Sequence, residues 1–138
     1  MPARRLFVNC AICSALGALA AGGSAGAQPA AGGGLVRNIL ETSDYPGNGL
    51  VTILVAADLP AGGVVARHTH PGLESTYVVA GELELAVQGQ PVRSLKPGDG
   101  FQIEPRAPHG LRGGASPVRL ATTYVVEKDK PLASPAPE

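Results

Sequence analysis

The stretch GGVVARHTHPGLESTYVVAG, residues 62–81, is the most informative part of this chain, because it holds two of the three histidines. It places His68 and His70 two residues apart and Glu74 four residues later, with glycines at its ends. Side chains at i and i+2 project from the same face of a β-strand, roughly 6.6 Å apart along the chain, so the two imidazoles can lean toward one point. Thr69 would then face the other way. We therefore expect a strand, a turn and a second strand that carries Glu74 near its start.

A second stretch supplies the third histidine. Residues 97–109 read PGDGFQIEPRAPH and end at His109, and the chain has three histidines in all. Together with the pair of the first stretch and Glu74, this histidine indicates one metal-binding pocket. Three nitrogens and one carboxylate oxygen suit Fe, Mn, Co, Ni, Cu or Zn better than Ca or Mg. The ligand types do not choose among these transition metals.

The two stretches resemble the two motifs of the cupin superfamily, in the form of a small single-domain bacterial cupin with a conserved barrel. The matching positions are Gly62, His68, His70, Glu74 and Gly81 in the first motif and Gly98, Asp99 and His109 in the second. The resemblance covers about residues 50–126. It implies an all-β fold, a small cupin-type barrel of the double-stranded β-helix or jelly-roll kind. It also implies one divalent transition metal held by His68, His70, Glu74 and His109.

The sequence departs from the second motif just before its histidine. Where the family has Pro-x-Gly, this chain has Glu104, Pro105 and Arg106, and Gly113 stands in place of an expected Asn. Glu104 and Arg106 are candidates for acid–base or substrate-binding groups, although an ion pair at the rim is the more common use of such residues. The spacing up to His109 is intact, so the departures bear on the rim rather than on the ligands.

Short strands separated by turns account for the rest of the domain. The strand pattern outside the motifs occurs at residues 50–57, 82–87, 92–95 and 118–126. Alternation points the side chains of Thr76, Val78, Leu83, Leu85 and Val87 inward. We expect Phe101 in the core, whereas Tyr77 either lines the pocket or packs outside the barrel. No stretch after residue 28 shows a sustained helical period, which favours one all-β domain over residues 35–128.

The first 27 residues have the pattern of an export signal. Two arginines precede an apolar run over residues 6–21, and residues 25–27 offer an A-x-A cleavage site. The run is shorter than a usual membrane-spanning helix, so we expect no stable membrane anchor after removal, with an anchor as the alternative. The start also resembles a twin-arginine signal, and Sec and twin-arginine export both stay open. Cys10 and Cys13 lie inside this segment and would be removed with it. A periplasmic or secreted location follows.

The charge composition limits the classes of partner that we expect. The 138 residues carry no net formal charge, and removal of the first 27 leaves nine basic against 11 acidic residues. No basic patch favours nucleic acid, so we expect a small-molecule ligand or substrate, and a homodimer stays open. Residues 28–34 are expected to form a flexible linker. Residues 129–138 contain three prolines and are expected to form a loose tail, packing across a partner subunit being the alternative.

Two classes of function are compatible with this pocket. Four protein ligands leave one or two coordination positions for water, substrate or dioxygen. The first class is a metal-dependent enzyme, such as a dioxygenase or isomerase of a small oxygen-rich molecule. The second is a non-catalytic periplasmic protein that binds a metal or a small ligand. Cupin-like barrels host both kinds of function, so the sequence leaves catalysis open.

Overall fold

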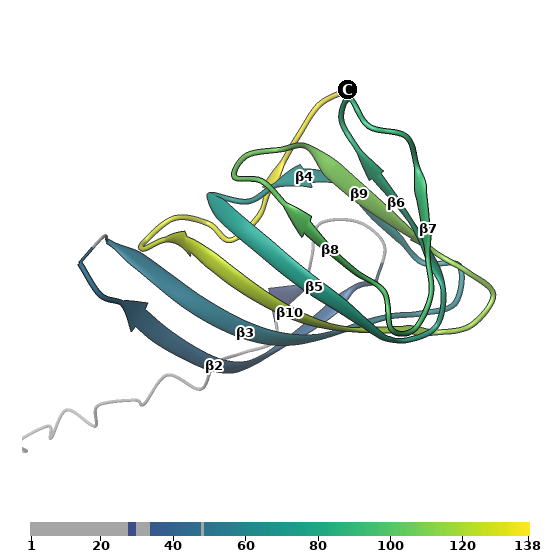
Figure 1. The fold of residues 1–138 in the computed structure, drawn as a ribbon, viewed down its shortest axis with the longest axis horizontal. Helices are drawn as coiled ribbons and strands as arrows, with labels where there is room; N and C mark the ends of the chain where they lie inside the picture. Colours follow the sequence, from purple (N-terminus) through teal and green to yellow (C-terminus); the bar gives the residue numbers. More distant parts are fainter. Residues whose placement is uncertain (1–27, 30–33, 48) are drawn as a thin grey trace, which may run out of the picture.

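The computed structural model describes residues 28–29, 34–47 and 49–138. Within these residues the chain is all β, with eleven strands in two antiparallel sheets and no helix (Figure 1). The expected export signal, with its two cysteines, lies outside the described residues. In the described part, no helix is long and apolar enough to cross a membrane.

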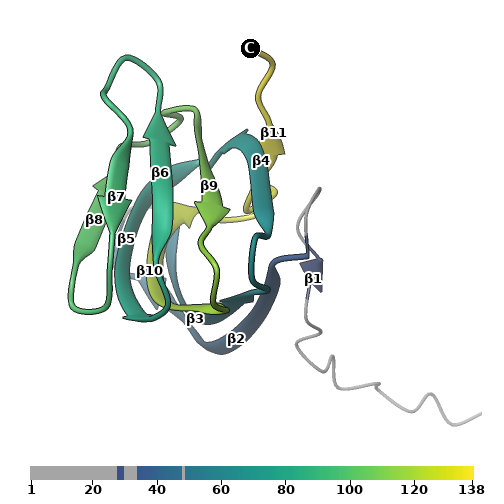
Figure 2. The same ribbon diagram turned by 90° about the vertical axis from the view of Figure 1, so that its right-hand side faces the viewer.

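The first three strands lie in one sheet, and after them the chain passes back and forth between the two sheets, apart from one hairpin that stays in the smaller sheet. The strands are β1 (Gln28–Pro29), β2 (Val36–Tyr45), β3 (Leu50–Leu59), β4 (Val64–Thr69), β5 (Gly72–Ala80), β6 (Leu83–Val87), β7 (Arg93–Leu95), β8 (Gly100–Ile103), β9 (His109–Gly113), β10 (Val118–Glu127) and β11 (Ser134–Pro135). The larger sheet has the order β1-β2-β3-β10-β5-β8 and the smaller sheet β11-β4-β9-β6-β7. Figure 2 shows the smaller sheet standing over the curved larger one. The predicted all-β jelly-roll barrel is confirmed.

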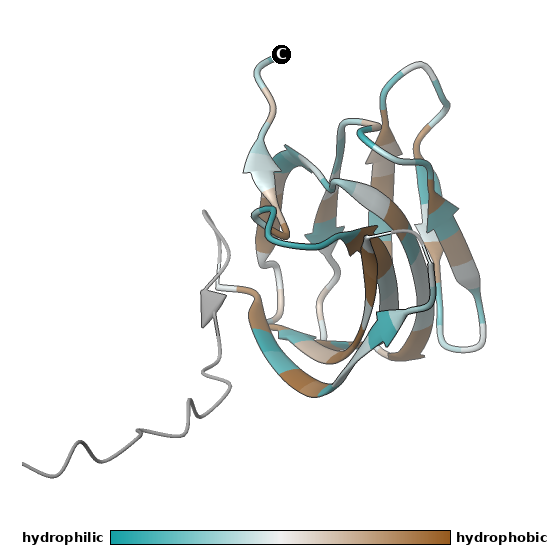
Figure 3. Cartoon of the chain, turned by 90° about the vertical axis from the view of Figure 1, so that its left-hand side faces the viewer, coloured by the Kyte–Doolittle hydropathy of each residue, from teal (hydrophilic) through white to brown (hydrophobic). Residues whose placement is uncertain are grey.

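Side chains that alternate along the strands fill the space between the sheets. Figure 3 shows this alternation as hydrophobic bands in brown between hydrophilic ones in teal. The residues predicted to point inward are buried: Thr76, Val78, Leu83, Leu85 and Phe101, with Val87 partly buried. Each buried Leu or Val side chain stabilises the fold by about 1.5–3 kcal/mol relative to leaving it exposed. Tyr77 is 53% exposed and therefore packs outside the barrel.

The sequence did not predict one long strand, β2. The four segments predicted outside the motifs coincide with β3, β6, β7 and β10, but β2 was not predicted. Its apolar residues Val36 and Leu40 are exposed, whereas Arg37 between them is buried. The register against β3 shifts between Ile39 and Glu41, which breaks the period of two. Exposed apolar residues and a buried arginine invert the hydrophobic pattern of this strand, and the register shift interrupts it. The sequence of β2 therefore does not alternate as an amphipathic strand does.

The chain after residue 128 is not a loose tail, and that prediction was wrong. β11 pairs with β4, with Ser134 opposite Thr69 and Pro135 opposite His68. Proline lacks an N–H and is excluded from central strands, but β11 is the edge strand of its sheet, where that donor has no partner to lose. The segment predicted as a linker likewise contributes β1, which pairs with β2 at an edge of the larger sheet.

Candidate metal centre

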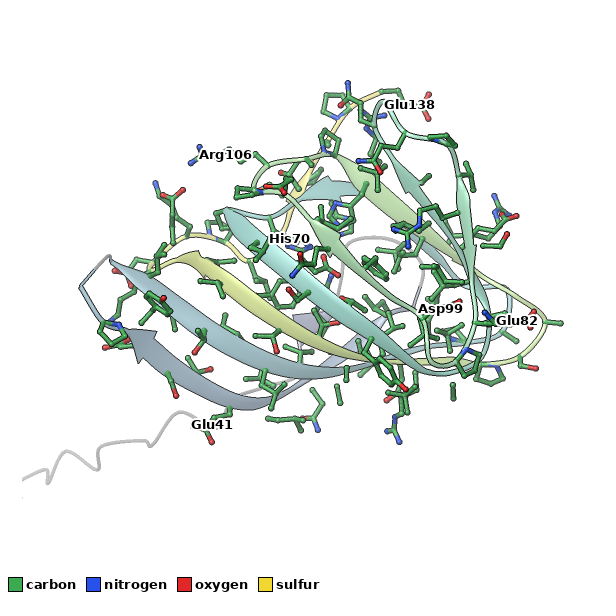
Figure 4. The ribbon with its side chains drawn as sticks, viewed as in Figure 1. Glu41, His70, Glu82, Asp99, Arg106 and Glu138 are labelled. Atoms are coloured by element: carbon green, nitrogen blue, oxygen red, sulfur yellow. The ribbon has the colours of Figure 1, made fainter. Side chains whose placement is uncertain are left out.

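Three strands and one bend bring the four predicted ligands together. His68 lies in β4, His70 follows that strand, Glu74 lies in β5 and His109 begins β9. All four side chains are buried, with 2–8% of each residue exposed. Figure 4 shows His70 pointing into the space between the sheets. The centre is therefore in the barrel interior, at residues that both sheets contribute.

The local backbone explains why these residues meet. His68 and His109 are directly opposite each other in the β4–β9 pair. A Cβ at Gly72 would collide with the carbonyl of Val125, so only glycine allows β5 to begin this close to β10. The backbone N–H of Arg106 donates to the carbonyl of His70 at 2.9 Å, which ties the loop of the second motif to the first.

Nitrogen and oxygen atoms of these side chains converge on one point. The Nε2 atoms of His68 and His70 are 3.1 Å apart. Oε2 of Glu74 lies 3.0 Å from Nε2 of His70 and 3.2 Å from Nε2 of His109. The three imidazoles form a cluster that could hold a metal ion.

Backbone carbonyls orient all three imidazoles. The Nδ1 atoms of His68, His70 and His109 face the carbonyls of Ala66 (2.8 Å), Leu132 and Ala107 (2.9 Å), respectively. A carbonyl oxygen only accepts hydrogen bonds, so each Nδ1 carries the hydrogen and each neutral ring presents its Nε2 lone pair inward. The same arrangement orients metal-binding histidines in general.

A second pair of contacts orients the carboxylate. The hydroxyl of Thr76 donates to Oε1 of Glu74 at 2.7 Å, and Thr76 and Thr122 share a hydrogen bond of 2.8 Å. Oε1 is thereby satisfied, and Oε2 is the oxygen that faces the imidazoles. Among the described residues, Oε2 has no hydrogen-bond donor although it is buried.

These atoms fit a transition-metal ion. Three inward lone pairs and one buried carboxylate oxygen repel one another unless a cation lies between them. Metal–nitrogen bonds of about 2.0–2.1 Å place neighbouring ligand atoms about 3.0–3.4 Å apart, which matches the separations found here. The donor set, the tautomers and these three separations are compatible with a bound metal ion.

The interior favours neutral imidazole and ionised carboxylate. Burial, with the charge of His109, lowers the pKa of His68 from 6.5 to about 4. Burial alone would raise the pKa of Glu74, but a hydrogen or a positive charge held between Oε2 and the rings of His109 and His70 outweighs burial and holds that pKa far below its usual range. Both shifts favour the protonation states in which these groups bind metal.

The two rim candidates lie apart from the cluster. Arg106 projects from the surface in Figure 4 and pairs with Glu127. Glu104 is exposed, and its carbonyl accepts the N–H of Ala107 at 3.1 Å. The ion pair expected at the rim is thus present for Arg106, and neither side chain reaches the imidazoles.

Tyr124 and Arg37 are buried residues with polar groups that the sequence did not predict. Tyr124 in β10 is 3% exposed, and its ring centroid lies 4.8 Å from that of His70. Burial and the charge of Glu74 raise its pKa well above the usual value, which keeps the hydroxyl protonated. Arg37 in β2 is 6% exposed. Alternation along residues 118–126 contained the signal for Tyr124, whereas the missed strand β2 concealed Arg37.

Known proteins share both the sequence pattern and the fold. The family described as Cupin domain matches residues 56–126, just over half of the chain. Dimethylsulfoniopropionate lyase DddQ of Ruegeria pomeroyi is 39% identical over 54 residues, which are 39% of this chain but 27% of that protein. This chain thus spans only about a quarter of its curated relative in sequence.

Solved structures resemble the barrel over more of its length. The crystal structure of DMSP lyase DddQ from Ruegeria pomeroyi has a TM-score of 0.56 and 27% identity, over 62% of this chain and 43% of that one. An uncharacterized conserved protein with a double-stranded β-helix domain from Klebsiella pneumoniae has a TM-score of 0.60 and 23% identity, over 81% of this chain and 91% of that one. At that identity the second likeness concerns the fold alone.

Proposed function

The chain belongs to the cupin family, and on that basis we propose that it binds one divalent transition metal through His68, His70, Glu74 and His109. The observation that carries this proposal is the set of lone pairs that converge without a donor between them. Fe, Mn, Co, Ni, Cu and Zn all suit these ligands.

The proposed activity is metal-dependent catalysis on a small oxygen-bearing molecule. A metal bound here would polarise a substrate oxygen as a Lewis acid or, if redox-active, support dioxygenase chemistry. Thr76 orients Glu74 as a ligand, and Tyr124 holds a proton on its hydroxyl beside the cluster. These residues supply orientation and a hydrogen-bond donor, which a lyase or an isomerase could use.

Similarity to DddQ supports an enzyme over a non-catalytic binder. DddQ is named as a lyase of dimethylsulfoniopropionate, so that compound is the first substrate to assay with metal-loaded protein. The matched region is a small part of that enzyme. Its substrate is therefore proposed for this chain as a compound to test and is not assigned by similarity. Absence of turnover with any small oxygen-bearing compound would favour a non-catalytic metal- or ligand-binding protein.

Residues 1–27 are proposed to direct export, so that the barrel works in the periplasm or outside the cell. The positive start, the apolar run and the A-x-A site support this proposal. The intact mass of protein recovered from a periplasmic fraction tests it, since cleavage after residue 27 leaves a chain that begins at Gln28. Recovery of uncleaved chain from the cytoplasm alone would contradict export.

Metal analysis tests the central proposal. We expect close to one transition-metal ion per chain after metal-replete expression of the wild-type protein. His109→Gln keeps most of the side-chain volume but removes one ligand, so we expect metal affinity to fall at least roughly 100-fold, beyond the 10- to 100-fold effect of losing a supporting contact. Arg106→Ala is the control and should retain the metal. Metal-free wild-type protein, or full occupancy in the His109→Gln variant, would refute the assignment.

A further inference from the structure

Arg37 is a buried cation without a carboxylate partner. Its position in β2 is opposite Ala57, which is 3% exposed and faces the core, so the Arg37 side chain also enters the interior. Across residues 28–29, 34–47 and 49–138, no Asp or Glu lies within ion-pairing distance of it, whereas Arg106 and Arg119 each have one. Its Nε also lacks a hydrogen-bond partner there. Burying a guanidinium that has no carboxylate partner is costly, and arginine is almost never buried without a partner.

The Arg37 side chain reaches the neighbourhood of the metal cluster. Its guanidinium lies close enough to His68 for its charge to act on that ring. It also lies close enough to Tyr124 for its charge to act on the hydroxyl. Tyr124 in turn packs against His70 and is opposite Glu74 in the β10–β5 pair. Arg37, Tyr124 and the cluster therefore share one region of the interior.

With a metal bound, the interior around Arg37 would carry more positive than negative charge. Glu74 is the one buried carboxylate among the described residues. A divalent metal would bring two positive charges, and Arg37 adds a third, against a single negative charge from Glu74. A small anionic ligand beside the metal would offset this excess and provide the partner that Arg37 lacks.

We propose that Arg37 and Tyr124 form a carboxylate-binding subsite next to the metal, and that the substrate is a small carboxylate. The planar guanidinium presents two parallel N–H donors that match the two oxygens of a carboxylate, and the tyrosine hydroxyl supplies a third donor. The metal would then act on another part of the same molecule. The substrate class rests on the proposed function, whereas anion binding at Arg37 requires only this chain.

Calorimetric titration with propionate and its neutral analogue propionamide tests the subsite. We expect metal-loaded wild-type protein to bind propionate more tightly than propionamide. Arg37→Met should weaken propionate binding roughly 10- to 100-fold, the range of a hydrogen bond to a charged group, and leave metal content unchanged. Arg67→Met is the matched control, because the Nε of Arg67 is also unpaired while its guanidinium bonds to exposed Gln88 at 2.8 Å. It should bind propionate as wild type does.

A second variant and a second anion keep the test decisive. Arg37→Lys retains the buried charge without the planar fork, so it should bind propionate more weakly than wild type even if Arg37→Met does not fold. Unchanged propionate affinity in Arg37→Lys or Arg37→Met would overturn the proposal. Tighter binding of inorganic phosphate than of propionate would overturn the assignment to carboxylates.

Repeating the titrations with metal-free protein separates the two proposals. Metal content measured on each sample reports on the metal centre alone. If wild-type protein proves metal-free but still binds propionate in a way that depends on Arg37, the subsite stands and the metal proposal fails. If metal is present and propionate binding is indifferent to Arg37, the subsite fails and the metal proposal stands.

Discussion

Arg106 has a backbone conformation that glycine adopts more easily. Its φ is 63°, in the left-handed region, and it occupies the position where the second cupin motif has glycine. A residue with a Cβ pays about 1–2 kcal/mol for this conformation. The ion pair with Glu127 offsets little of that, because exposed pairs contribute about 0–1 kcal/mol.

We therefore expect Arg106→Gly to be more stable than Arg106→Ala by about 1 kcal/mol, since both variants lose the ion pair but only glycine relieves the backbone. Urea denaturation of the three proteins at neutral pH measures the difference. Equal free energies of unfolding for the glycine and alanine variants would show that the left-handed conformation costs nothing here.

At the level of single residues, the sequence predicts the proposed metal ligands better than the groups that orient them. His68, His70 and Glu74 follow from a short fixed spacing along neighbouring strands. The group that orients His70 is the backbone carbonyl of Leu132, which is far away in sequence. Every residue has such a carbonyl, so the residue type gives no indication of this role. The burial of Arg37 is equally hard to predict, because a buried arginine between exposed apolar residues reverses the usual pattern of burial.

Among the elements, the segment after β10 has a role that its composition conceals. β11 pairs with the edge of β4, and the N–H of Ala136 also donates to the carbonyl of Arg67 at 3.2 Å. This pairing holds Leu132 where its carbonyl accepts the Nδ1–H of His70. The three prolines of residues 129–138 suggested a loose tail because proline excludes central strands, but they do not exclude an edge.

Removing residues 131–138 should therefore weaken metal binding roughly 10- to 100-fold, as expected when a histidine ligand loses the group that orients it. Competition with a chromogenic chelator measures the affinity. Ser134→Ala keeps every backbone atom of the segment and should bind metal as wild type does. Full affinity in the truncated chain would mean that the Leu132 carbonyl does not orient His70 for binding.

For the whole molecule, a centre that is buried before metal binds makes the metal-free fold sensitive to acid. The unfolded chain protonates His68 near pH 6.5, whereas the folded chain does so only near pH 4. Between these values the unfolded state binds more protons, so stability falls as the pH falls. The pKa of Glu74 is also lower in the folded state, so its contribution is present above about pH 4.5 and is lost below it.

We expect metal-free protein to lose roughly 1–3 kcal/mol of stability through His68 between pH 6.5 and 4. Urea titrations at several pH values measure the loss. His68→Gln should remove most of the pH dependence in this window and leave the decline below pH 4.5. An equal dependence in both proteins would assign the effect to other groups.

The overall barrel follows from the sequence because short apolar strands are separated by turns at short, regular intervals. Residues 50–57 and 118–126 have the composition of strands, residues 82–87 alternate, and the two histidine stretches place the remaining central strands. The outer elements β1, β2 and β11 are pairings at the sheet edges, where burial is one-sided and the hydrophobic pattern is weak.

The hydrogen bond between His70 and Leu132 also sets an order of events during biosynthesis. The carbonyl lies 62 residues after the imidazole that it orients. A ribosome has therefore made His68, His70, Glu74 and His109 well before it adds the atom that fixes the tautomer of His70. A nascent chain can collect its ligands early, yet its metal centre takes its final geometry only when the last strand has emerged.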